Sequence, residues 1–266
     1  MCITQFLLVA GFLASVNPVF GSRLDGEPLE CDDFMISIAT KADIDFYSEC
    51  PELPELDAFF GLHHNFTGPF EMPNVKSVTR FSAGYLGPKS KGSDRVDDGV
   101  TSISMPDLEE VNGGWMLVAY LNELTSISFP KLHTVAVDLV VVDNPKLRKL
   151  TLPALVNVTS GMLVDGHFDE INLPKLKHVA FLKVKSTGAV DCQALGKNLS
   201  SLVFHPDKND VGKGFTCWTP DEKNRYNSSD PNPTSSNLSE GASVRAGYLT
   251  TLFGLVAMAT FEKLLM

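Results

Sequence analysis

Two aspartates four residues apart, Asp165 and Asp169, form the strongest local cluster of groups suited to acid–base chemistry. Hydrolysis of a glycosidic bond needs two carboxyl groups about 5 to 10 Å apart, one acting as acid and the other as base or nucleophile. A second acidic cluster comprises Asp94, Asp97 and Asp98. Both clusters lie in turn-like stretches where carboxylates are usually solvated, so we expect neither cluster to be catalytic and the chain not to be an enzyme.

The histidines do not form a metal site by their spacing. His63 and His64 are adjacent but have no third ligand nearby, and His133, His178 and His205 are isolated at expected turns. Structural zinc needs four Cys or His ligands at characteristic spacings. We therefore expect no metal and no cofactor.

Three aromatic residues, Trp115, Tyr120 and Phe129, have side chains that can stack on a sugar ring. They fall inside the repeated part of the chain described below. Aromatic residues at such positions usually belong to the core, so we expect packing rather than binding.

The cysteines indicate an oxidising compartment. Cys2 leaves with the predicted signal peptide, which leaves an even set of four: Cys31, Cys50, Cys192 and Cys217. Four cysteines allow three connectivities. Local pairs, Cys31 with Cys50 and Cys192 with Cys217, would close short loops at the two ends of the domain and contribute roughly 3 kcal/mol each.

The N-terminus has the pattern of a secretory signal peptide over residues 1–21. An apolar run from Phe6 to Val16 is followed by Pro18 and the small residue Gly21, which places cleavage before Ser22. The alternative is a membrane anchor. That reading is weaker because a spanning helix needs about 20 apolar residues and this run is shorter.

The C-terminus has the order of a glycosylphosphatidylinositol (GPI) attachment signal: small residues, a short spacer and an apolar tail over Tyr248–Phe261. Attachment is predicted at Gly241, with Ser239 and Asn237 as alternatives, and residues 242–266 would be the removed propeptide. This predicts membrane association through a GPI lipid. A single-pass membrane protein is the competing interpretation, but the run is short and no basic cluster follows it.

Sequons for N-glycosylation also favour the secretory pathway. They occur at Asn65, Asn157, Asn198, Asn227 and Asn237. The net charge of −10 falls to about −11 without the predicted tail, which carries +1. Such a chain is not expected to bind nucleic acid.

An apolar-Pro-x-Leu mark recurs through the middle of the chain and predicts a repeat architecture. The marks are Met105–Leu108, Phe129–Leu132, Leu152–Leu155 and Leu173–Leu176, preceded by a degenerate copy at Met72–Val75. The spacing of the prolines from 106 to 174 is 21 to 24 residues, a period typical of solenoids. The fold class is therefore predicted to be mainly β, a β-solenoid of short leucine-rich coils, because each coil contains proline and many β-branched residues.

Several local features refine this prediction. Residues 87–94 are rich in Gly, Ser and Lys and predict a loop inserted into one coil. Asn122 and Asn144 precede the first leucine of a repeat. Each is expected either to bond the backbone at a bend or to be an exposed turn residue.

The solenoid, over residues 22–218, needs small helical caps at its ends. Residues 35–38 are predicted as a strand, and Thr40 as the cap of a helix over residues 41–48 tied back by the first cystine. At the other end, residues 193–202 are predicted as a helix and 215–218 as an extended edge. Residues 219–241 are polar and Pro-rich and predict a disordered stalk.

Together these motifs resemble the fungal GPI-anchored cell-wall organisation and sporulation family, whose domain is similar to the receptor L-domain. The resemblance covers roughly residues 31–241 and includes "SFPKL", "TLPAL", "NLPKL", "VVDNPKL" and the terminal "CQAL" to "FTCW" pair. It implies a right-handed β-solenoid at the plasma membrane and cell wall, with a role in wall organisation and no catalytic residues. The chain is shorter than the fuller family members.

Three hypotheses about function follow, in falling order: a structural wall glycoprotein, a receptor-like module that binds a glycan or protein ligand, and a carbohydrate-active enzyme. The possible partners are wall glycans or wall proteins. The sequence names no ligand.

Overall fold

A computed structural model describes residues 29–31, 35–50, 59–62, 66–84, 99–202 and 214–228 of the chain. This part is mainly β, as the sequence predicted, and contains two α-helices and sheets that are largely parallel. The predicted inserted loop at 87–94 lies outside the described residues. The helices are α1 (Lys41–Ser48) and α2 (Cys192–Leu199), with a short 3₁₀ helix η1 (Glu222–Asn224).

The strands are β1 (Met35–Ile38), β2 (Phe59–Leu62), β3 (Gly68–Glu71), β4 (Ser77–Val78), β5 (Arg80–Gly84), β6 (Val100–Ser104), β7 (Glu110–Val111), β8 (Met116–Ala119), β9 (Ser126–Ser128), β10 (Thr134–Val135), β11 (Leu139–Val142), β12 (Lys149–Thr151), β13 (Asn157–Gly166), β14 (Glu170–Asn172), β15 (His178–Ser186), β16 (Gly214–Trp218) and β17 (Tyr226–Asn227).

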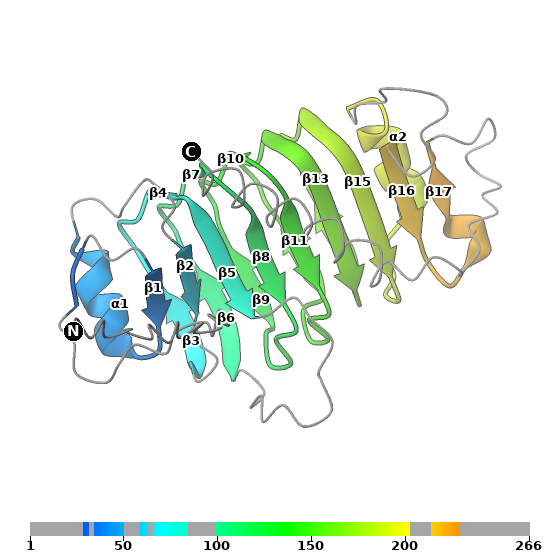
Figure 1. Ribbon diagram of the computed structural model, residues 1–266. Coiled ribbons are helices and arrows are strands. Elements are labelled where there is room, and N and C mark those ends of the chain that lie inside the picture. The colour runs from blue at the N-terminus through cyan, green and yellow to red at the C-terminus, as the bar shows by residue number, and fades with distance from the viewer. Residues whose placement is uncertain are drawn as a thin grey trace, which may run out of the picture.

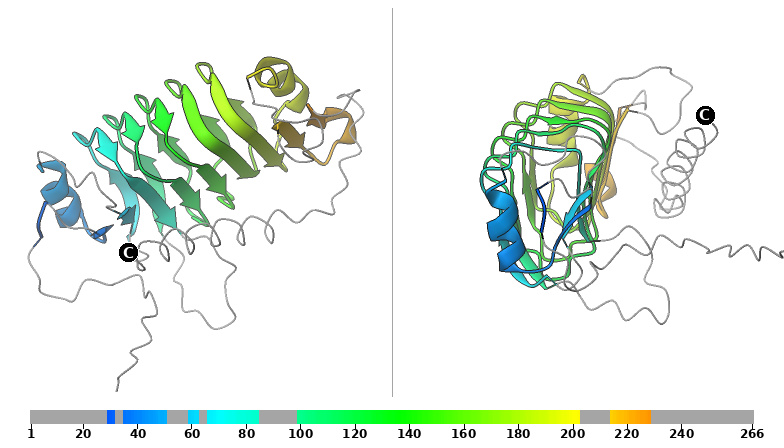
Figure 2. Two further views of the ribbon diagram at one scale, coloured as in Figure 1. Left: turned by 45° about the horizontal axis from the view of Figure 1, so that its top comes forward. Right: turned by 60° about the vertical axis from the view of Figure 1, so that its left-hand side comes forward.

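Each repeat contributes strands to several parallel stacks, and each strand pairs with its counterpart in the next repeat. One stack has the order β1-β2-β5-β8-β11-β13, and β13 continues through β15 to β16. The long strand β13 also pairs with β10, which joins the shorter stack β4-β7-β10 to the same sheet. Two smaller sheets, β3-β6-β9 and β12-β14, complete the repeats. Figures 1 and 2 show successive repeats lying one behind another along the molecule.

The parallel register places equivalent apolar residues of successive repeats directly beside one another. Five valines form one such ladder across β4, β7, β10, β13 and β15: Val78, Val111, Val135, Val158 and Val179. A second ladder crosses the large stack through Ile36, Phe60, Phe81, Met116, Leu139, Met162, Leu182 and Phe215. Every member of both ladders is buried. Because a single repeat cannot bury its own apolar face, these ladders are the main source of stability.

Buried polar side chains satisfy the backbone where the chain bends between strands. Asn144 is 1% exposed; its Nδ2 donates to the Val118 carbonyl at 3.0 Å and its Oδ1 accepts from the Leu121 amide at 3.0 Å. This confirms the backbone-bonding interpretation for Asn144, whereas Asn122 is partly exposed. Ser186 has a similar role that sequence analysis missed: its Oγ donates to the Phe168 carbonyl and accepts from the Phe168 and Gly188 amides.

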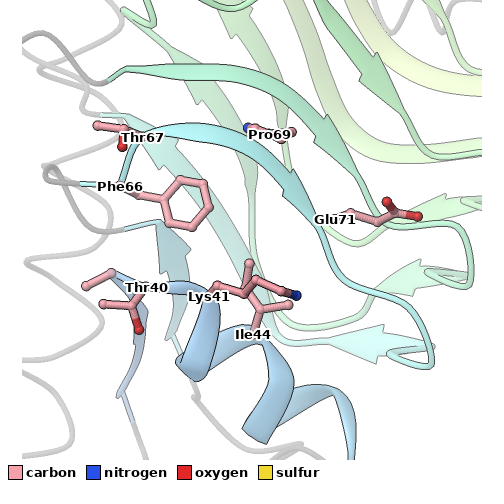
Figure 3. A pocket seen from close by; sticks show the side chains of 8 residues that line it. Thr40, Lys41, Ile44, Phe66, Thr67, Pro69 and Glu71 are labelled. Atoms are coloured by element: carbon pink, nitrogen blue, oxygen red, sulfur yellow. The ribbon is translucent and has the colours of Figure 1, made fainter.

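The N-terminal cap matches the prediction closely. Thr40 caps α1, since its Oγ1 accepts from the Asp43 amide while the Asp43 carboxylate accepts from the Thr40 amide. The Cys31–Cys50 disulfide ties the end of this helix back to the start of the domain. Ile44 and Tyr47 face the core. Figure 3 shows the first turn of α1 beside β3.

The C-terminal cap contains the predicted helix and strand, but with a shorter helix and one additional strand. α2 begins at Cys192 rather than Gln193, is capped by Asp191, and ends at Leu199 rather than Leu202. The predicted edge strand, β16, pairs in parallel with β15 on one side and antiparallel with β17 on the other. The Cys192–Cys217 disulfide joins α2 to β16.

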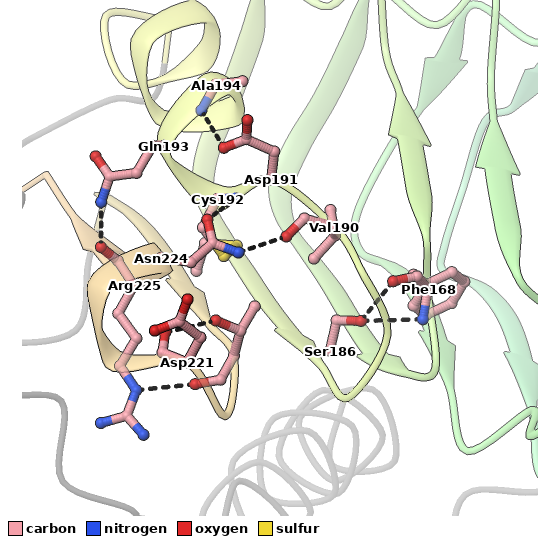
Figure 4. The surroundings of a disulfide bond; sticks show 12 residues. Phe168, Ser186, Val190, Asp191, Cys192, Gln193, Ala194, Asp221, Asn224 and Arg225 are labelled. Carbon is pink, nitrogen blue, oxygen red and sulfur yellow. Dashed lines mark hydrogen bonds between the residues drawn. A yellow bond between two sulfur atoms is a disulfide. The ribbon is translucent and has the colours of Figure 1, made fainter.

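The prediction of a disordered stalk beginning at Thr219 is wrong for its first ten residues, because 219–228 fold onto the cap. Asn224 links this segment to the chain before α2. Its Nδ2 donates to the Val190 carbonyl at 2.8 Å, and its Oδ1 accepts from the Cys192 amide at 3.0 Å. Arg225 Nε donates to the Thr219 carbonyl, and the Arg225 carbonyl accepts from Gln193 Nε2 (Figure 4). These hydrogen bonds hold residues 219–228 against the cap, which their polar composition did not indicate. The remaining stalk residues, 229–241, lie outside the described residues.

Candidate functional site

The structure places Asp169 in an ion pair between repeats. Its carboxylate accepts from Arg148 Nε at 2.8 Å and from Arg148 Nη2 at 3.2 Å, and also from the Ala189 amide at 3.1 Å. The hydrogen bond from Arg148, and then that from Ala189, hold the pKa of Asp169 below its ordinary value. A general acid needs the opposite shift, so Asp169 is suited to pairing repeats rather than to donating a proton.

Asp165, the other member of the predicted cluster, lies on β13 with a lysine of the next strand nearby. Its Oδ2 is 3.9 Å from Lys185 Nζ, and Lys185 is the register partner of Asp165 on β15. The two aspartates therefore each face a cation from a neighbouring repeat. Both carboxylates therefore take part in ion pairs between repeats.

The low pKa of Asp169 has a consequence for stability at acid pH. Because its pKa in the folded state lies below the unfolded value of about 3.9, its contribution to stability is present above that pH and is lost as the pH falls through the folded-state pKa. We expect Asp169→Asn to flatten the dependence of unfolding free energy on pH below about pH 4. Urea unfolding of wild type and variant between pH 3 and 6 measures this. Arg148→Gln removes the larger cause of the lowered pKa, leaves the Ala189 hydrogen bond and should flatten the curve in part. Parallel curves for wild type and both variants would contradict the assignment.

Further ion pairs link successive repeats along the surface. They are Lys131 with Asp107 at 2.8 Å, Lys146 with Glu123 at 2.6 Å and Lys149 with Glu170 at 3.0 Å. The hydrogen bond from Lys131 lowers the pKa of Asp107, and the same bond raises the pKa of Lys131. Each exposed ion pair of this kind contributes little to the free energy of unfolding. We therefore assign these pairs a role in aligning neighbouring repeats rather than in stabilising the domain.

The histidines described by the structure form hydrogen bonds with neighbouring threonines or are exposed. His133 Nδ1 lies 3.0 Å from Thr134 Oγ1, His167 Nδ1 lies 2.9 Å from Thr187 Oγ1, and His178 is exposed. Within the described ranges, no group of three or more His, Cys, Asp or Glu side chains is placed to hold a metal ion. His63, His64, His205, Asp94, Asp97 and Asp98 lie outside those ranges.

The three candidate aromatic residues separate into two environments. Phe129 is 1% exposed in the main core, as predicted. Trp115 and Tyr120 instead flank a second apolar cluster on the opposite face of the large sheet, consisting of Leu117, Ala119, Val140, Val142 and Leu163. We call these five residues the outer ridge. The guanidinium of Arg80 lies 5.1 Å from the centre of the Trp115 ring, at the margin of the ridge.

A hollow of about 500 Å³ lies between the start of α1 and β3 (Figure 3). Its charged groups are Lys41 and Glu71, and Lys41 Nζ already pairs with Asp45 at 2.9 Å. The lining residues are Ala39, Thr40, Lys41, Ile44, Phe66, Thr67, Pro69 and Glu71. Among the lining residues that the structure describes, Glu71 is the single carboxylate, whereas glycoside hydrolysis requires two. The mixed polarity of this lining can accommodate a small ligand.

The chain is similar to a fungal protein. It is 28% identical over 182 residues to Protein ecm33 of Aspergillus fumigatus. The match covers 59% of this chain and 41% of that protein, so the chain spans less than half the length of the relative it matches. No family model matches the chain, and no solved structure matches it.

Three of the predicted glycosylation sites lie within the described residues. Asn198 is exposed on α2 and Asn157 is partly exposed on β13, where its Nδ2 donates to Thr159 Oγ1 at 3.4 Å. Asn227 is partly exposed on β17 and is the register partner of Thr216. Asn65 and Asn237, together with the predicted attachment residue Gly241, lie outside the described residues.

Both predicted disulfides are present, with Cα–Cα distances of 5.6 Å for Cys31–Cys50 and 5.5 Å for Cys192–Cys217. Of the helices in the described part of the chain, none combines the length and apolar character needed to cross a bilayer. The predicted signal peptide and C-terminal tail lie outside this part.

Proposed function

We propose that this chain is a GPI-anchored cell-surface glycoprotein that contributes to fungal cell-wall organisation without catalysis. The observation that carries the proposal is the similarity to Protein ecm33 of Aspergillus fumigatus. Independently of that similarity, the repeats and terminal motifs of the chain resemble the fungal GPI-anchored cell-wall family. In this proposal the protein resides on the outer face of the plasma membrane and in the wall.

The proposed architecture is a right-handed β-solenoid similar to the receptor L-domain. Its support is the parallel register that links each strand to the equivalent strand one repeat later, as from β8 to β11 and from β11 to β13. Apolar ladders run through the interior and a cystine closes each end. A solenoid of this kind presents long, rigid faces, which suits an organising role among extended wall polymers.

Secretion is supported by the cystines, because disulfides persist in oxidising compartments. It is also supported by the solvent access of Asn157 and Asn198, which leaves room for attached glycans. The absence of catalysis is a proposal supported by the ion pairs of Asp165 and Asp169, since both carboxylates face cations.

A receptor-like module that binds a small glycan or peptide is the second candidate. The observation that favours it is the hollow beside α1, whose volume of about 500 Å³ is within the usual range for ligand sites. Saturable binding of a wall oligosaccharide to the purified domain would favour this second candidate over a purely structural role.

Phospholipase C treatment of intact cells tests the anchor. We expect the enzyme to release the protein into the medium, and mass spectrometry to find a C-terminal peptide ending at Gly241 with ethanolamine attached. Ser239 and Asn237 are the alternative ends. A matched variant, Gly241→Trp, should reduce attachment at that residue because the transamidase requires small side chains there. A protein that stays with the cells and retains residues 248–261 would overturn the proposal.

A further inference from the structure

The outer ridge is apolar where the outside of a sheet would ordinarily be polar. In β8 and β11, residues alternate between the two faces of the sheet, yet all four residues of each strand are apolar and buried. Leu117 and Val140 are 4% exposed, Ala119 is 0% exposed, and Leu163 on β13 is 9% exposed. Strands with apolar residues on both faces are typical of sheets covered on both sides. Among the described residues, only Trp115 and Tyr120 are apolar side chains packed against the ridge.

The register limits the ridge to three strands. Leu117, Val140 and Leu163 are register partners on neighbouring strands. The next register partners are polar, Ser82 on β5 and Lys183 on β15, so the apolar surface ends there. Three strands span about 10 Å between the outermost backbones, which matches the diameter of one helix. A stable dimer interface takes about 20 to 30 residues from each partner. The ridge and its two aromatic neighbours number seven residues, so the surface suits a single segment better than a second copy.

The chain itself contains a segment of the required character within reach. Ser228 pairs with Phe215 at the start of β16, and β16 lies two strands from β13 in the same sheet. Residues 229–247 can extend roughly 60 Å, far more than the roughly 10 Å from β16 to β13. The following 14 residues, Tyr248–Phe261, carry no charged side chain.

We propose that Tyr248–Phe261 docks on the outer ridge of its own chain and covers it until the tail is removed. The ridge and Tyr248–Phe261 are both predominantly apolar and uncharged, so contact between them keeps apolar side chains out of water, in keeping with the 0 to 9% exposure of the ridge residues. The timing of removal rests on the proposed GPI attachment: cleavage after Gly241 takes the cover away in the same step that attaches the lipid, so the ridge is open in the anchored protein.

Hydrogen–deuterium exchange of the uncleaved chain tests the docking. The chain is produced in cells that lack GPI transamidase activity, so that residues 22–266 remain together. We expect the amides of 248–261 to exchange at least tenfold faster in Val140→Asp than in wild type. Thr216→Asp is the matched control, because Thr216 shares the outward row of β16 beyond the ridge, and it should leave this exchange unchanged.

A second variant leaves the folded domain intact. Leu252→Asp with Leu255→Asp alters the tail alone, and we expect oxidative footprinting at Trp115 and Leu117 to increase severalfold. Equal exchange of 248–261 in wild type and Val140→Asp, or protection that grows with protein concentration, would overturn the proposal, the latter by indicating a second copy. Both measurements use the uncleaved chain, whereas phospholipase release uses the mature one, so docking and anchoring can fail independently.

Discussion

Replacing Cys192 and Cys217 together by alanine is expected to lower the free energy of unfolding by about 3.5 kcal/mol. The bond closes a loop with a sequence separation of 25 residues, and its removal restores that conformational freedom to the unfolded chain. Both cysteines are 0% exposed, so the double variant also leaves a small cavity. Domains of this size are stable by only about 5–15 kcal/mol in all, which makes the loss a large fraction.

Urea unfolding with intrinsic tryptophan fluorescence measures the effect. Trp218 adjoins Cys217 on β16 and therefore reports directly on the C-terminal cap. The matched control is Cys31→Ala with Cys50→Ala, whose loop has a sequence separation of 19 residues and for which we expect a loss of about 3 kcal/mol. An unchanged urea midpoint in the Cys192–Cys217 variant would show that the cap holds without its cystine.

The repeated core could be predicted because its signal is periodic and local. Each Pro-x-Leu mark fixed the frame of its repeat, so Leu132, Leu155 and Leu176 were assigned equivalent positions, and all three are buried. The N-terminal helix was predictable for a similar reason: Thr40 and Asp43 form a capping box within four residues. Signals confined to one repeat or one turn are available from sequence alone.

The part of the C-terminal cap beyond Trp218 was missed because its contacts join residues distant in sequence. Asn224 bonds Val190 and Cys192 across more than 30 residues, and Tyr226 packs its ring 5.6 Å from Phe215. Gly196 permits this packing, since a Cβ there would lie 2.4 Å from the Tyr226 ring. The composition of the segment after Trp218 is rich in Asn, Asp, Ser and Pro, which by itself indicates disorder.

The outer ridge was also missed, although its signal was present. The β-branched residues of Leu139–Val142 support a strand whether one face or both faces are buried, so they do not by themselves indicate the ridge. Four consecutive apolar residues in a strand instead indicate burial on both faces. β15 differs from these strands, because Lys183 and Lys185 alternate with Leu182 and Val184. Only one face of the sheet is apolar there.

Leu155→Ala is expected to lower the free energy of unfolding by about 2–5 kcal/mol. Leu155 is 0% exposed in a middle repeat, and the equivalent residues of the adjoining repeats, Leu132 and Leu176, are 0% and 3% exposed. Truncation therefore removes contacts in both directions along the stack and leaves a cavity that neighbouring repeats cannot readily fill. Leu155→Met keeps the side-chain volume and should cost less than about 1.5 kcal/mol. Urea unfolding of the two variants distinguishes a stacked core from independent repeats. If both variants lost an equal, small amount of unfolding free energy, stacking would be contradicted. Only for a side chain enclosed between repeats does the loss depend strongly on the volume removed.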